Sequence, residues 1–180
     1  AVAANAEDPA PRVRQICAPA LPENAGVCVD DTFEVVFGTD KTVKDSVYQY
    51  SPFVADTEID ALIVTETKSD KVQGWSYGVV HDMAYLTILE ATVGGTDAET
   101  SLIGGFDATS IDVEKCDTAA CSNRTKGGGF ISATVLSLKK PVQLTKDARN
   151  AICKAKYKLT ADAGVAGTYL EISKLIAAVS

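Results

Sequence analysis

The chain has 180 residues, of which 46% are hydrophobic and 23% are charged, the composition of an ordinary globular domain that can bury a core of its own. Seventeen basic and 24 acidic residues give a formal net charge of −7, which argues against nucleic acid and against anionic lipid as partners. No apolar run approaches the ~18 residues of a membrane helix, so the sequence predicts no membrane insertion.

The first 26 residues are expected to form an extended arm outside the folded domain, which we predict over residues 27–180. Four of the six prolines lie within residues 1–27, where hydrophobic periodicity is weak. Such an arm is either mobile or ordered only against a neighbour. The chain opens with AVAANAEDPAP, without an initiator methionine or a basic segment, as is typical of a mature end left by signal-peptide removal.

Alternating and β-branched patterns predict strands in the first half of the domain. These predicted strands cover residues 27–37, 59–65, 72–80 and 84–92. The segment IDALIVT is apolar enough to be buried on both faces. In VQGWSYGVV, the core signature Trp75, Tyr77 and Val79 falls on one side of the strand. The short separation between the last two strands predicts that they form a hairpin.

The second half of the domain begins with a loop-rich, glycine-rich stretch at 93–129 and then returns to strands. Further strands are predicted at residues 130–138, 151–159 and 168–179. Between 151 and 159, lysines alternate with apolar residues, which predicts a half-buried strand with a lysine-studded outer face and with Cys153 as a buried free thiol. Residues 145–151 are expected to form a helical turn capped by Thr145. The fold class that follows is all-β, an antiparallel sandwich of the jelly-roll type.

Four of the five cysteines form two close pairs, Cys17 with Cys28 and Cys116 with Cys121. Zinc is the rival interpretation, but these spacings and a single histidine do not match the usual zinc patterns. We therefore favour two loop-closing disulfides, which imply an oxidising, extracellular or cell-surface location. Asn123 begins an Asn-Arg-Thr sequon and is a candidate glycosylation site.

The segments VQGWSYGVVHD, AYLTILEATVG, FISATVLSL and AKYKLTADAG, followed by a closing strand, resemble cohesin-like sandwich modules over about residues 27–180. The resemblance implies a secreted, non-catalytic jelly-roll domain, related to the cellulosome cohesins and to carbohydrate-binding modules. Cohesins bind dockerins, and relatives serve in surface and adhesive assemblies. The N-terminal arm with its Cys17/Cys28 loop departs from the cohesin pattern.

His81-Asp82 is the candidate catalytic position of the chain, because it contains the only histidine. Ser76 precedes His81 on the same strand, but a catalytic triad needs a nucleophile, a base and an orienting group in contact, and no GxSxG or HExxH motif is present. We therefore expect His81 to be a strand-end residue and Asp82 to start a turn. No pair of carboxylates stands out as glycosidase-like, and the sequence predicts a protein that is not an enzyme.

Two ligand classes remain as minor alternatives. Trp75, Tyr77, Tyr85 and Tyr48 could form a sugar-binding platform, although the alternation around Trp75 favours core packing. Oxygen ligands in loops could hold calcium, but no EF-hand-like run is present and no cofactor is expected.

The main functional hypothesis is a structural subunit that assembles with copies of itself, through its arm and strand edges, into a filament or surface layer. The alternative is a cohesin-type receptor module that binds a dockerin-like protein. Carbohydrate binding ranks third.

Overall fold

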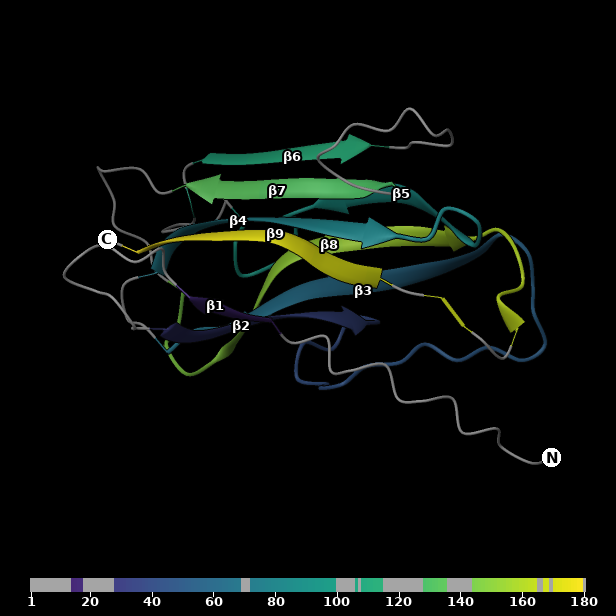
Figure 1. Cartoon of the computed structure of the whole chain (residues 1–180), viewed down its shortest axis with the longest axis horizontal. Coiled ribbons are helices and arrows are strands. Elements are labelled where there is room, and N and C mark those ends of the chain that lie inside the picture. Colours follow the sequence, from purple (N-terminus) through teal and green to yellow (C-terminus); the bar gives the residue numbers. More distant parts are fainter. Residues whose placement is uncertain are drawn as a thin grey trace.

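A computed structural model of the chain describes residues 14–17, 28–68, 72–99, 106, 108–114, 128–135, 144–164, 167–168 and 170–179 (Figure 1). Within these residues, nine strands and no α-helix are found. The strands are β1 (Arg14–Cys17), β2 (Cys28–Phe37), β3 (Thr57–Glu66), β4 (Val72–His81), β5 (Leu86–Thr92), β6 (Ala108–Glu114), β7 (Gly129–Val135), β8 (Arg149–Leu159) and β9 (Leu170–Val179). None of the described residues forms a helix of the length and apolarity needed to span a membrane.

The strands form two antiparallel sheets that stack on each other (Figure 1). One sheet has five strands in the order β1-β2-β3-β8-β5, and the other has four in the order β6-β7-β4-β9. The predicted antiparallel β-sandwich is thereby confirmed.

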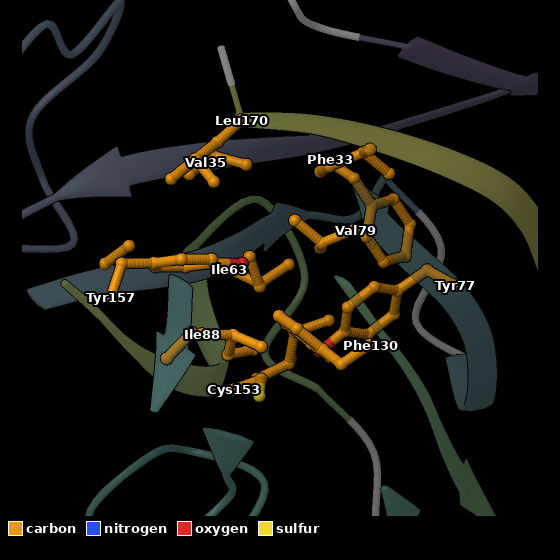
Figure 2. Packing of buried hydrophobic residues seen from close by; sticks show 14 of the residues in the cluster. Phe33, Val35, Ile63, Tyr77, Val79, Ile88, Phe130, Cys153, Tyr157 and Leu170 are labelled. Carbon is orange, nitrogen blue, oxygen red and sulfur yellow. The ribbon is translucent and has the colours of Figure 1, made fainter. Parts of the chain in front are cut away.

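The main core lies between the two sheets and receives side chains from both. Figure 2 shows Ile63, Ile88 and Cys153 of the five-stranded sheet facing Tyr77 and Phe130 of the four-stranded sheet. The aromatic rings meet in tilted or edge-to-face pairs, such as Tyr77 with Phe130 at 6.2 Å between ring centroids, an arrangement that adds to the stabilisation from buried area.

A second, smaller core lies on the outer face of the five-stranded sheet. Val36, Leu62, Val64 and Ala151 are buried there, on the side of β2 and β3 that points away from the main core. The prediction that IDALIVT is buried on both faces is therefore confirmed. A sheet face turned away from the partner sheet needs a cover of its own, and the connection between β2 and β3 forms part of it.

Strand β8 follows the predicted alternation closely. Tyr157 and Leu159 are buried, whereas Lys154, Lys156 and Lys158 are half-buried on the outer face. In register, Glu58 lies opposite Lys158, and Asp60 lies opposite Lys156. Because opposite charges face each other across neighbouring strands, the lysine row also supports strand pairing.

The predicted hairpin over residues 72–92 is wrong. Strand β4 pairs with β7 and β9, whereas β5 pairs with β8 in the other sheet. The turn at 82–85 therefore crosses from one sheet to the other. The sequence pattern does not distinguish these cases, because two strands that face one core from opposite sheets show the same alternation as two neighbours in one sheet.

Two local predictions also differ from the structure. Strand β6 lies inside the stretch expected to be loop. Strand β1 lies within the expected extended arm, and the boundary of that arm at residue 26 stays a prediction. The helical turn expected at 145–151 is a plain turn, closed by the amide of Ala148 donating to the carbonyl of Thr145 over 3.4 Å, and β8 already begins at Arg149.

Glycines at the start of β7 allow close approach to β4. Gly128 has φ of +91° and Gly129 has φ of +145°, and a Cβ atom at Gly129 would collide with the carbonyl oxygen of Val79. Only glycine combines this backbone conformation with this contact, which explains part of the GGG run.

Candidate functional site

His81 is the last residue of β4 and is buried, with 2% of its surface exposed. Its ring packs edge-on against Tyr157 with 5.4 Å between centroids, and its Nδ1 has no hydrogen-bond partner among the described residues. Burial lowers the pKa of His81 from 6.5 to about 4, against an opposing effect of the Asp82 carboxylate. Ser76 lies five residues earlier and points to the other face of the strand, so the two do not form a nucleophile–base pair.

Asp82 begins the turn after β4, as expected. Its carboxylate accepts a hydrogen bond from the amide of Ala84 over 3.0 Å, and its carbonyl accepts bonds from the amides of Tyr85 and Leu86. This side chain therefore organises the crossing between the sheets.

The proposed aromatic platform is divided among different parts of the molecule. Trp75 and Tyr77 are 3% and 0% exposed in the main core, where Trp75 meets Phe106 edge-on at 4.9 Å. Tyr85 is half-buried against the same core. Tyr48 lies apart from them, in the connection between β2 and β3, so these four rings offer no common surface to a sugar.

One of the five cysteines is a free thiol in the structure, and the other four make up the two pairs predicted to be disulfides. Cys153 is free and fully buried, as predicted, and burial raises the pKa of its thiol to about 11. Cys17 and Cys28 occupy directly opposed positions in the β1–β2 register, a spacing compatible with a disulfide, which stays a prediction. Cys116, Cys121 and Asn123 lie outside the described residues. No cluster of three metal-ligating side chains occurs within the described part of the chain.

The connection at residues 38–56, here called the β2–β3 loop, is fixed to the sheet at several points. Glu34 of β2 and Arg149 of β8 form a largely buried ion pair, with 2.7 Å between Glu34 Oε2 and Arg149 Nη2. Arg149 also donates to the carbonyls of Lys41 and Val43, and Glu34 Oε1 accepts from the amide of Asp45. Two strands thus hold the first half of the loop.

The second half of the loop is held at the other end. Tyr50 donates its hydroxyl proton to the carboxylate of Asp162 over 2.8 Å and accepts from the amide of Ala163 over 2.9 Å. Phe37, Tyr48, Tyr50 and Phe53 form a ladder of tilted or edge-on rings with centroids 5.9–6.5 Å apart. Phe37, Tyr50 and Phe53 also pack on the main core, so contacts with the core hold three of these four rings in place.

Although it is fixed, the loop exposes apolar side chains. All large hydrophobic side chains that are exposed among the described residues belong to it: Val43, Val47, Tyr48 and Val54, with 40%, 72%, 37% and 59% of their surface accessible. We call these four residues the apolar patch. In Figure 1 the loop is the blue segment that runs along the lower right side of the view between β2 and β3.

Beside the patch lies a hollow of about 270 Å³, open to solvent. Phe37, Val47 and Tyr48 line it together with Glu58 and Asp60 of β3. We call it the aromatic–acid notch.

A second surface hollow, of about 670 Å³, lies further along the same sheet. Its Asp97 carboxylate is already engaged by Lys41 Nζ over 2.6 Å and by the amide of Ala151 over 2.7 Å. That carboxylate helps to hold the β2–β3 loop and the β5–β6 connection against the sheet. This hollow is therefore the weaker candidate for a binding site.

Of the four exposed apolar side chains of the loop, the sequence pattern singled out Tyr48 alone. The signal that could have located the site is the composition of VKDSVYQYSPFV, which is rich in apolar and aromatic residues although it lacks the period of a strand or helix. Loops run over the surface, so apolar loop side chains either cover a core or are exposed, and this loop has side chains of both kinds.

No protein-family model matches the chain, and no curated protein matches it. Among solved structures, a chain from the complex of the sixth cohesin of Acetivibrio cellulolyticus scaffoldin B with a mutant Cel5 dockerin is similar, with a TM-score of 0.45 and 9% identity over 67% of this chain and 74% of that one. A chain of a type I cohesin–dockerin complex from Clostridium thermocellum gives a TM-score of 0.47 and 9% identity over 69% and 74%. Both are similarities of overall fold alone.

Proposed function

We propose that this chain is an extracellular, non-catalytic protein-binding module, that its partner is a protein of the dockerin class, and that the β2–β3 loop is the surface it uses. The observation that carries the proposal is the concentration of exposed apolar side chains on this one loop. Large apolar side chains that are exposed along a single segment point to an interaction site there, and a surface fixed in advance loses little entropy when it binds.

The shape of the site supports a protein as the partner rather than a small molecule. Small-molecule sites are concave and commonly occupy 300–1,000 Å³, whereas the notch is open and measures about 270 Å³. The apolar patch extends from Val43 to Val54 along the loop and outside that hollow. The dockerin class is the kind of partner that the cohesin resemblance of the sequence implies.

The proposal can be tested by titrating the immobilised chain with a panel of purified dockerin modules. We expect one-to-one binding by at least one of them, and Val47→Asp should weaken it about tenfold or more, because a charge would be buried in the apolar contact. Ser110→Asp, which adds the same charge at an exposed position on β6, is the matched control and should bind like the unchanged chain. Absence of binding across the panel, or equal binding by the Val47 variant, would contradict the proposal.

Self-assembly is the second candidate, and one observation favours it. Strand β1 comes from the segment before the domain and adds to the edge of the five-stranded sheet, antiparallel to β2. Addition of an extended segment to a sheet edge is a common way for β modules to join. The same segment pairing with β2 of another copy would connect subunits head to tail, into a filament.

A further inference from the structure

We propose that the aromatic–acid notch is the specificity pocket of the binding surface and that it receives an arginine side chain of the protein partner. This inference rests on the proposed function and adds the chemistry of the residue recognised. The occupant is inferred from the acidic side chains and the apolar side chains that line the notch together.

The acidic wall carries negative charge that the molecule itself does not fully neutralise. Glu58 and Asp60 alternate on the outer face of β3, and Glu58 Oε2 lies 3.0 Å from Lys156 Nζ. Asp60 forms no ion pair with any described residue, although it lies close enough to Lys156 to raise the pKa of that ammonium group together with Glu58. The half-buried Asp60 carboxylate is therefore available to a cation from outside.

The apolar wall of the notch, lined by Phe37, Val47 and Tyr48, suits the rest of an arginine side chain. Val47 and Tyr48 are exposed, and Tyr48 is held at a fixed tilt by Phe37, with 6.2 Å between ring centroids. An aliphatic stem can lie on this wall while the planar guanidinium stacks on the ring and reaches the carboxylate. A lysine would gain the charge interaction alone, since its ammonium group is compact and strongly hydrated.

The charge of the whole molecule acts in the same direction. A net charge of −7 attracts a basic partner over a distance and speeds the encounter. The notch then determines where the basic side chain docks, and the patch beside it supplies the apolar contact. A central anchor surrounded by apolar contacts is the usual layout of a binding hot spot.

The test is an NMR titration of the full chain with N-acetyl-arginine methylamide, with the citrulline analogue as the uncharged match. We expect saturable amide shifts at Gly38, Tyr48 and Ile59 with a dissociation constant on the order of 1 mM, and no saturable shifts with citrulline. Asp60→Asn should weaken binding about fivefold or more. Glu90→Gln, which removes one charge from β5 on the other side of Lys156, should change it by less than about twofold.

The outcomes separate this inference from the proposed function, because the probe reads the notch without any protein partner. No saturable arginine binding, equal binding of citrulline, or equal losses in the Asp60 and Glu90 variants would overturn the notch as an arginine pocket. Equal binding of a dockerin to the unchanged chain and to the Asp60 variant would also overturn the arginine pocket. The proposal that the β2–β3 loop is the binding surface would still hold in that case.

Discussion

Individual buried polar residues make the stability of this sandwich depend on pH. His81 is neutral in the folded protein, since burial lowers its pKa from 6.5 to about 4. Between these values the unfolded chain binds more protons than the folded one, so the free energy of unfolding must fall as the pH falls from about 6.5 toward 4. Above about pH 6.5 both states hold a neutral imidazole, and this contribution to stability is fully present.

We predict that the free energy of unfolding, measured by urea denaturation, falls by about 2 kcal/mol between pH 7 and pH 5. His81→Phe keeps an aromatic ring against Tyr157 and removes the titrating group, so the variant should show a nearly flat profile in this range, whatever its absolute stability. Carboxylates with lowered pKa values, such as Glu66 beside Lys68, affect stability only at lower pH. An unchanged slope in the variant would assign the pH dependence to another group.

At this scale the sequence was informative where one strand pattern decided the outcome. Alternation placed Trp75 and Tyr77 on one face, and both lie in the main core. It could not indicate that Glu34 would be buried, because its partner Arg149 lies 115 positions away. A charged residue in a strand normally predicts an exposed position, and only tertiary pairing reverses that expectation.

Among the elements, the β2–β3 loop stands out because it exposes apolar side chains while contacts with the sheet hold it in place. The Glu34–Arg149 pair is its main fastening, and its two side chains are only 9% and 14% exposed. Removing one partner of such a pair leaves the other buried without compensation, which is costly.

We predict that Arg149→Met lowers the free energy of unfolding by about 3 kcal/mol and speeds amide hydrogen exchange in residues 39–47. Lys156→Met is the control, because it removes a cation of the same strand whose pairing with Glu58 is solvent-exposed. It should leave loop exchange unchanged and lower stability much less. Equal effects of the two substitutions would mean that the buried pair does not hold the loop.

Prediction of the elements from the sequence succeeded for strands with a strong local pattern. It failed where the outcome depends on which distant strand or residue an element contacts. The lysine alternation located β8, and the β-branched run located β3. The assignment of β4 and β5 to different sheets depends on which neighbours they pair with, which no local pattern encodes. The β2–β3 loop was missed because its residues have no period, and their placement follows from contacts such as Tyr50 with Asp162, 112 positions apart.

At the scale of the whole molecule, removal of the arm distinguishes two hypotheses. The chain is either a module that binds another protein or a subunit that assembles with copies of itself. Strand β1 pairs with β2 over Arg14–Cys17, so removal of residues 1–26 deletes one edge strand of the five-stranded sheet. Among the side chains that the structure describes, the buried residues of the main core begin at Phe33. The truncated chain should therefore remain folded, with a cooperative unfolding transition.

We predict that a chain lacking residues 1–26 stays monomeric in light scattering and negative-stain microscopy under conditions in which the full chain forms filaments. The physical reason is that the deleted segment supplies the main-chain hydrogen bonds that strand addition needs. Filaments from the truncated chain would show that assembly uses another surface. If the full chain stays monomeric at high concentration, the self-assembly hypothesis is wrong. A different protein would then be the partner expected at the β2–β3 loop.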